Sequence, residues 1–196
     1  MPVRAAGEDS PVPGGEEAED ALELVYVLDT TAFIARWPLY APRGRMYTTS
    51  LVLGEVRDPS SREGLELALS LGRVEVRDPS PGSIRRVEKL AARHGLHVSL
   101  SRTDLSVLAL ALELAGEGRR VVVVTDDYSV QNLAALLGLE YRSLRTRGIS
   151  RVEDYEAVCP ACGYRSRRPG ERVCPVCGTP LSRRRTSRRT SGRRPS

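Results

Sequence analysis

Hydrophobic positions in the central part of the chain alternate between short apolar runs and longer segments with helical spacing. Residues 24–28 and 121–124 are continuously apolar and rich in valine, which is typical of strands buried on both faces of a parallel sheet. Two more strands are expected over 74–77 and 140–144. Helical spacing covers 31–37, 50–57, 61–71, 83–94, 103–116 and 129–137. This order predicts an α/β domain with an open, doubly wound parallel sheet between helices.

Acidic residues follow the two buried strands directly. Asp29 comes after 24–28, and Asp126 and Asp127 come after 121–124 and Thr125. In an open α/β sheet the functional crevice lies at the carboxyl ends of the strands, so these positions are candidate site residues. An aspartate before a helix is also an ordinary N-cap, and each position taken alone fits that structural role equally well.

Two further carboxylates lie at helical positions that are unusual for a solvated face. Asp104 shares a stripe with apolar residues in a helix that is apolar nearly all round, which directs its side chain toward the core. If that helix starts at Ser101 or Thr103, Asp104 instead lies in its first turn as a partner of the helix dipole. Glu55 lies beside the apolar face of the segment 50–57.

Several carboxylates in one crevice repel one another and raise their pKa values unless a cation binds there. Oxygen ligands without histidine or cysteine favour Mg²⁺ or Mn²⁺, and one or two such ions suit phosphodiester hydrolysis. Neither buried strand is followed by G-x-x-x-x-G-K-[ST] or G-x-G-x-x-G, and Lys89 is the single lysine of the sequence. P-loop chemistry is therefore excluded.

All four cysteines lie in one short window, as the pairs Cys159 with Cys162 and Cys174 with Cys177. Two C-x-x-C turns brought together form a closed tetrahedral shell for one structural Zn²⁺ ion, which leaves no open position for a substrate. Two disulfides are the alternative. The sequence shows no signal peptide and no apolar run of membrane-spanning length, which favours a reducing cytoplasm and therefore zinc.

The two ends of the chain carry opposite charges. Residues 1–23 hold seven acids and one arginine, and residues 181–196 hold seven arginines and no acid. Neither end has apolar periodicity, so we expect an acidic disordered leader over 1–23 and an Arg-rich disordered tail over 182–196. Between them we expect the α/β domain over 24–145, a basic linker over 146–158 and the zinc ribbon over 159–181.

Arginines interleaved with tyrosines occur in the linker and between the cysteine pairs. Arginine pairs with phosphates and stacks on unpaired bases, as single-stranded RNA requires. A solvated hinge and a solubilising tail are the alternative interpretation. The candidate RNA-binding residues are Arg142, Arg145, Arg147, Arg151, Tyr164, Arg165, Arg167 and Arg168.

The order and spacing of the acids resemble those of the PIN-domain nucleases across roughly residues 24–145. The stretch Thr125-Asp126-Asp127-Tyr128-Ser129-Val130-Gln131-Asn132-Leu133, joined to a C-terminal Cys₄ ribbon, is similar to the archaeal branch of the Nob family of ribosome-biogenesis endonucleases. The resemblance implies a PIN-like (Rossmann-like) fold. It also implies that Asp29, Glu55, Asp104 and Asp126 are catalytic Mg²⁺ or Mn²⁺ ligands, with Asp127 as a secondary acid.

The same resemblance implies a metal-dependent endoribonuclease that cuts precursor ribosomal RNA. The cut forms the mature 3′ end of small-subunit rRNA within a pre-ribosomal particle in the cytoplasm, without a membrane partner. One alternative is a PIN-type toxin ribonuclease, which would be a short single-domain chain. The other is a non-catalytic RNA-binding assembly factor, in which the acids are caps and the ribbon binds RNA. The sequence does not fix the oligomeric state.

Overall fold

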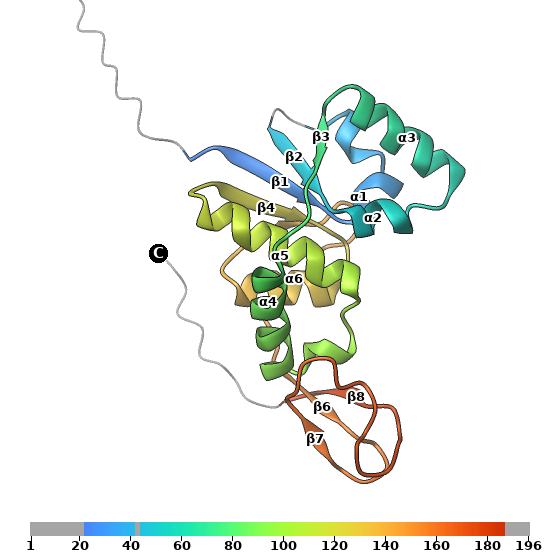
Figure 1. Cartoon of the computed structure of the whole chain (residues 1–196), viewed down its shortest axis with the longest axis vertical. Coiled ribbons are helices and arrows are strands. Elements are labelled where there is room, and N and C mark those ends of the chain that lie inside the picture. Colours follow the sequence, from blue (N-terminus) through green and yellow to red (C-terminus); the bar gives the residue numbers. More distant parts are fainter. Residues whose placement is uncertain (1–21, 42–43, 187–196) are drawn as a thin grey trace, which may run out of the picture.

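The structure is a computed structural model that describes residues 22–41 and 44–186 (Figure 1). Most of the expected acidic leader, residues 1–21, and residues 187–196 of the expected tail lie outside the described residues. The described chain forms a five-stranded sheet flanked by helices and a smaller three-stranded sheet near its C-terminal end.

The larger sheet has the order β3-β2-β1-β4-β5, and every neighbouring pair is parallel. Its strands are β1 Leu24–Leu28, β2 Arg45–Thr48, β3 Val74–Val76, β4 Arg120–Val124 and β5 Glu140–Arg142. The central strands β1 and β4 pair along their whole length, so that Leu28 lies opposite Val124. The α/β class and the parallel sheet are thereby confirmed, and the ends of β1 and β4 lie side by side.

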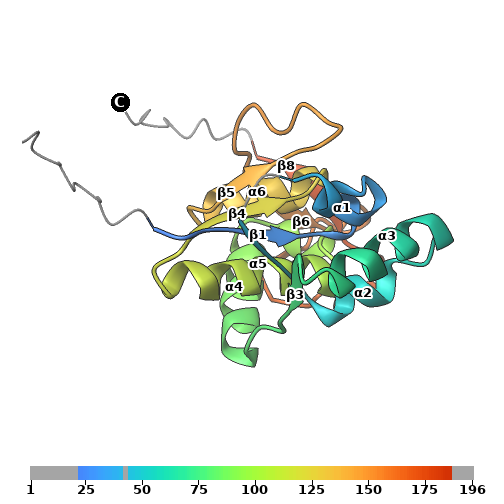
Figure 2. The same ribbon diagram turned by 90° about the horizontal axis from the view of Figure 1, so that it is seen from above.

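Helices connect the strands and cover the sheet on both sides. They are α1 Thr30–Ile34, α2 Ser50–Glu55, α3 Pro59–Ser70, α4 Pro81–Arg93, α5 Arg102–Gly116 and α6 Tyr128–Leu136, with 3₁₀ turns η1 Trp37–Leu39 and η2 Leu96–Val98. Figure 2 shows α4 and α5 on one side of the central strands and α6 on the other. Among the described residues no helix is both long and apolar enough to cross a membrane.

Polar side chains cap the first turn of each α-helix. The caps of α1 and α6 are Asp29 and Asp127, and α5 begins with a capping box in which Ser101 and Asp104 bond each other's backbone N–H. Such caps satisfy free N–H groups that the helix itself leaves unpaired. Because α1 and α6 follow β1 and β4, their caps are brought to one edge of the sheet.

Two segments of the larger domain differ from the sequence prediction. The strand β2 was not expected, because its four residues start with a charged arginine and show no alternation. The first helix is shorter than predicted: α1 ends at Ile34, and Arg36 adopts a left-handed conformation with φ 51° before η1. Left-handed backbone terminates a helix, so Trp37 packs in the core from η1 rather than from α1.

The smaller sheet corrects the predicted bounds of the ribbon and the tail. It consists of β6 Tyr155–Val158, β7 Arg165–Ser166 and β8 Ser182–Arg185, in the antiparallel order β7-β6-β8. The last four residues of the predicted linker and the first four of the predicted disordered tail are therefore strands of the ribbon. Backbone pairing with β6 orders β8, although all four of its residues are polar and exposed.

The ribbon packs against the end of the α/β domain where η2 lies, below α4 in Figure 1. Val98 of η2 contacts the small apolar cluster of Cys159, Cys174 and Leu181. Arg172 of the ribbon donates hydrogen bonds to the carbonyl oxygens of Val98 and Leu100. The two parts are therefore joined by specific contacts as well as by the linker.

Candidate active site and zinc-binding cluster

Asp29 is a buried carboxylate at the end of β1, with 5% of its surface exposed. Its Oδ1 accepts a hydrogen bond of 2.7 Å from the backbone N–H of Thr30, and its Oδ2 accepts one of 2.7 Å from the hydroxyl of Thr125. Burial raises the pKa of Asp29 to about 6, although both hydrogen bonds act against this rise. The charges of Asp104 and Asp127 raise the pKa of Asp29 further, so the three carboxylates share one electrostatic environment.

Glu55 and Asp104 reach the same region from α2 and α5. Glu55 is exposed, and its two carboxylate oxygens accept hydrogen bonds from the hydroxyls of Thr30 at 3.1 Å and Thr103 at 2.5 Å. Asp104 is half-buried rather than directed into the core, because it belongs to the capping box of α5. Burial raises the pKa of Asp104, and the charges of Asp127 and Glu55 add to that rise.

Asp127 caps α6 and lies in the acidic cluster. Its Oδ1 accepts hydrogen bonds from the backbone N–H groups of Ser129 at 2.5 Å and Val130 at 3.2 Å. Its charge acts on both Asp29 and Asp104. The acids that the structure brings together are therefore Asp29, Glu55, Asp104 and Asp127.

Asp126, the neighbouring residue, is held by a different part of the chain. Its Oδ1 accepts hydrogen bonds from the backbone N–H groups of Leu144 at 2.8 Å, Arg145 at 3.0 Å and Thr146 at 3.3 Å, and the Arg145 side chain lies 3.4 Å from its Oδ2. Burial raises the pKa of Asp126, but these donors outweigh burial and leave the pKa below its usual value. This geometry does not support the expectation that Asp126 is a metal ligand and Asp127 only a secondary acid.

Three threonines that sequence reasoning missed orient the acids. Thr30, Thr103 and Thr125 each lie next to one of the predicted aspartates, and their hydroxyls donate to Glu55 or Asp29. A hydroxyl that donates to a carboxylate fixes its rotamer without adding charge. A threonine stands next to an aspartate in three separate segments, and this repeated pairing is the sequence signal that could have identified the three threonines.

The acidic cluster contains oxygen ligands alone, which suits a hard divalent cation. Among the described residues, no three carboxylates have candidate ligand atoms that all lie within 4.8 Å of one another. Carboxylates with this wider spacing leave room for water as additional ligands, and Mg²⁺ usually keeps several waters. The donor chemistry of the site therefore fits Mg²⁺ or Mn²⁺.

The arginines predicted to bind RNA occupy different settings. The guanidinium of Arg142 lies 5.8 Å from the ring centre of Trp37, and Arg145 pairs with Asp126. The side chains of Arg151 and Arg165 pair with Glu153 and Glu156. Arg147, Arg167 and Arg168 are exposed, whereas Tyr164 is half-buried and donates its hydroxyl to Glu171.

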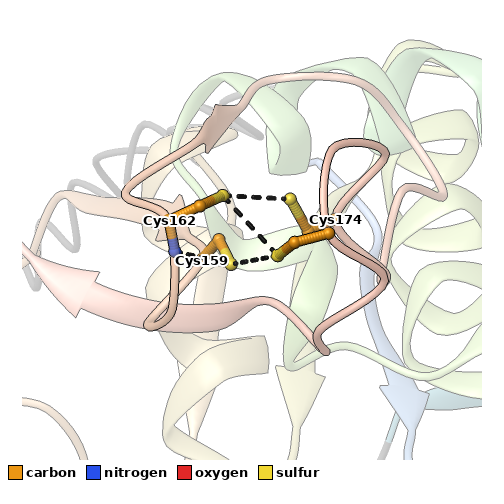
Figure 3. Close-up of side chains that lie close together, drawn as sticks. Cys159, Cys162 and Cys174 are labelled. Atoms are coloured by element: carbon orange, nitrogen blue, oxygen red, sulfur yellow. Dashed lines mark hydrogen bonds between the residues drawn. The ribbon is translucent and has the colours of Figure 1, made fainter.

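The four cysteines converge in the ribbon (Figure 3). They are free thiols whose Sγ atoms all lie within 4.8 Å of one another, with Cys159 to Cys177 at 3.4 Å and Cys162 to Cys174 at 3.5 Å. Tetrahedral zinc with Zn–S bonds of about 2.3 Å needs sulfurs about 3.8 Å apart. The cluster is therefore consistent with a zinc ribbon.

Comparison with known proteins gives relatives over the same regions. Residues 26–114 match the family model described as the PIN domain of ribonuclease. The chain is 42% identical to endoribonuclease Nob1 of Pyrococcus abyssi over 162 residues, which are 82% of this chain and 93% of the relative. It is 51% identical to ribonuclease VapC3 of Aeropyrum pernix, over 69% of this chain and 92% of the relative.

A more distant relative is the 20S-pre-rRNA D-site endonuclease NOB1 of Saccharomyces cerevisiae. It is 37% identical over 50% of this chain, which covers 22% of the yeast protein. The fold, the clustered acids and the cysteine cluster agree with these relationships. The chain is thus an endoribonuclease, and it belongs to the Nob family of PIN-domain endoribonucleases.

Proposed function

We propose that this endoribonuclease cuts precursor ribosomal RNA to form the mature 3′ end of small-subunit rRNA within a pre-ribosomal particle. The observation that carries the proposal is the convergence of Asp29, Asp104 and Asp127 near the carboxyl ends of β1 and β4, where the charge of Asp127 raises the pKa of both Asp29 and Asp104. The yeast relative, named as a pre-rRNA endonuclease, supports the choice of substrate.

Asp29, Glu55, Asp104 and Asp127 would hold one or two Mg²⁺ or Mn²⁺ ions. When bound, such an ion lowers the pKa of a water molecule and stabilises the leaving oxygen of the phosphodiester. The threonine hydroxyls keep the carboxylates aimed at the ion, and the buried position of Asp29 strengthens its attraction for positive charge. The four cysteines would hold one structural Zn²⁺ ion, which a reducing cytoplasm permits.

The test is incubation of the purified chain and Mn²⁺ with a precursor that spans the 3′ end of small-subunit rRNA, followed by mapping of the cut. Wild type should give one defined cut at the mature end. Cleavage elsewhere only, or no cleavage, would refute the proposal. Elemental analysis should find one equivalent of zinc per chain.

The neighbouring aspartates provide a matched pair of variants. Asp127→Asn should lower the cleavage rate by more than roughly 100-fold, since loss of even an outer partner of a metal ligand costs roughly 10- to 100-fold. Asp126→Asn should cut nearly as fast as wild type, because an amide oxygen still accepts from the N–H groups of Leu144 and Arg145. The reverse order of activities would return Asp126 to the ligand set.

A further inference from the structure

A cavity of about 300 Å³ lies where the first turn of α6, the linker and the ribbon meet. It is lined by Tyr128, Asn132, Gly148, Ile149, Ser150, Arg151, Glu153, Tyr155 and Arg183. Tyr128 follows Asp127 directly in the chain and is 53% exposed. The cavity therefore opens within one residue of a carboxylate of the acidic cluster.

Two buried amide side chains of α6 hold the linker wall of the cavity in place. Gln131 donates to the carbonyl oxygen of Thr125 at 2.9 Å and accepts from the backbone N–H of Ile149 at 2.9 Å. Asn132 bonds both the N–H and the carbonyl oxygen of Glu153, each at 2.7 Å. The segment from Ile149 to Glu153 is thus a fixed wall rather than a free hinge.

The ribbon supplies the cationic side of the cavity. The guanidinium of Arg183 lies 4.2 Å from the ring centre of Tyr155 and donates to the hydroxyl of Ser129 at 2.9 Å. The backbone N–H of Ser129 in turn donates to Asp127. A residue of β8 is therefore connected to a carboxylate of the site through a single intervening residue.

The charges around the cavity favour an anionic ligand. Arg151 and Arg183 line it, and Glu153 is its one acidic residue. The carboxylate of Glu153 is already engaged by Arg151, Arg185 and the hydroxyl of Tyr155. An exposed aromatic ring beside guanidinium groups is the combination that binds unpaired nucleotides, through stacking and phosphate contacts.

We propose that this cavity binds one unpaired nucleotide of the RNA substrate next to the phosphodiester that is cut. The base stacks on Tyr128, and its phosphate meets Arg151 and Arg183. A volume near the lower limit of ligand pockets, about 300 Å³, suits one nucleotide rather than a duplex. The inference rests on the proposed function, because it assumes that the acidic cluster cuts RNA.

The experiment measures the affinity of single-stranded RNA that spans the mapped cut, without added Mg²⁺ or Mn²⁺ so that the RNA stays intact. Tyr128→Ala should weaken binding by about 5- to 150-fold, which corresponds to the ~1–3 kcal/mol of one stacked base. Tyr128→Phe keeps the ring and should bind within about twofold of wild type. Both variants should fold, because the side chain is half exposed.

A second set of measurements removes a base from the RNA instead of the ring from Tyr128. RNAs with one abasic site are scanned across the cut, and at one position next to it wild type should lose affinity by the same factor. The Tyr128→Ala variant should bind this abasic RNA as tightly as it binds the intact RNA. The ring and the base make the same contact, so the two losses of affinity are non-additive. The inference would be overturned if Tyr128→Ala bound RNA as tightly as wild type does. It would also be overturned if the fold-losses of affinity from the substitution and from the abasic site multiplied.

Cleavage of the same RNAs with Mn²⁺ separates the two proposals. If wild type cuts at the mature end but Tyr128→Ala binds as wild type does, the cavity inference fails and the proposed function stands. If the affinity pattern is found but the cut lies elsewhere, the proposed function fails and the nucleotide site stands. Wild type that binds none of the RNAs would overturn the inference about the cavity.

Discussion

Asp126 and Asp127 are neighbours with different chemical surroundings. Backbone N–H groups of residues 144–146 donate hydrogen bonds to the Asp126 carboxylate. These donors favour its ionised form and occupy lone pairs of its Oδ1. Asp127 uses one oxygen to cap α6 and keeps its charge close to Asp29 and Asp104. A single step along the chain therefore separates a residue that fixes a loop from one that completes the acidic cluster.

Asp29 makes stability depend on pH when no divalent metal is added. Its folded-state pKa of about 6 lies above the ordinary 3.8, so the folded chain keeps a proton that the unfolded chain releases between these values. The contribution of Asp29 to stability therefore falls as pH rises from about 4 to 6. Asp29→Asn removes this penalty and should be more stable than wild type at pH 8 by up to about 3 kcal/mol, with little difference near pH 4.

Urea unfolding of both proteins at several pH values measures this difference. Added Mn²⁺ is the control, because it should stabilise wild type at pH 8 and have a smaller effect on Asp29→Asn. A variant that is less stable than wild type at pH 8 in metal-free buffer would show that Asp29 has a structural role instead.

Asp29, Asp126 and Asp127 could be predicted because they follow buried apolar runs, including the four valines before Thr125, whereas Glu55 and Asp104 could be predicted from their positions on helices. The sequence alone could not show which of Asp126 and Asp127 belongs to the acidic cluster. The distinction depends on donors 18 to 20 residues further along, whose approach is fixed by the pairing of β5 with β4. Hydrogen bonds across that distance leave no local pattern.

Among the elements, long periodic helices and buried strands were predictable, whereas short strands were not. The strand β2 has four residues, and β7 and β8 contain no apolar residue. Their strand character comes from pairing with neighbours, and in the ribbon from the cysteine turns that bring β6 and β8 together. Sequence periodicity reports burial, so it misses β8, whose side chains are exposed, whereas the buried residues of β2 form a run too short to show a period.

Gly95 sets the contact between η2 and the ribbon strand β6. It has φ +63°, and a Cβ atom there would lie 2.6 Å from the carbonyl oxygen of Tyr155 and 2.7 Å from Glu156. Gly95→Ala should therefore destabilise the protein by more than the about 1–2 kcal/mol of left-handed backbone alone. It should also speed amide hydrogen exchange in η2 and β6, because the ribbon must move away.

Gly72→Ala is the matched control. Gly72 has the same φ of +63°, and a Cβ there would meet nothing within 4 Å. It should show the backbone penalty without faster exchange in the ribbon. Equal effects of the two substitutions on stability and exchange would mean that the close approach of Gly95 to β6 is not a constraint on docking.

At the scale of the whole molecule, side-chain contacts join the ribbon and the α/β domain. His94 at the end of α4 lies 2.5 Å from Asp154 of the linker, and Arg183 reaches Ser99 as well as Ser129. The seven arginines after Leu181 thus divide into two groups. Arg183, Arg184 and Arg185 belong to β8, and four more follow in the sequence.

This division changes the expected effect of shortening the chain. A chain that ends at Thr186 loses four arginines, and each phosphate contact on single-stranded RNA contributes about 0.7 to the log–log salt slope. The slope should flatten by at most about 3, with the cut position unchanged, because backbone contacts carry no sequence information. RNA affinity over a salt series measures this.

A chain that ends at Leu181 is the comparison. It also loses β8, so it should release the edge of the ribbon and lose the Arg183 contacts in addition to charge. If both shortened chains show the same slope and the same affinity, β8 takes no part in RNA binding. If the first shows the slope of the full chain, the last four arginines make no contact with phosphates.

Strand β8 lies late in the sequence, but its Arg183 contacts Ser99 and Ser129 of the α/β domain. This contact has a consequence for the order in which the parts are synthesised. The acidic cluster is complete once residue 127 has left the ribosome, but Arg183 and the ribbon edge follow more than fifty residues later. A nascent or prematurely terminated chain therefore carries the carboxylates of the acidic cluster without the contact between Arg183 and Ser129. The contacts of β8 with the α/β domain thus form only after nearly all of the described residues have been synthesised.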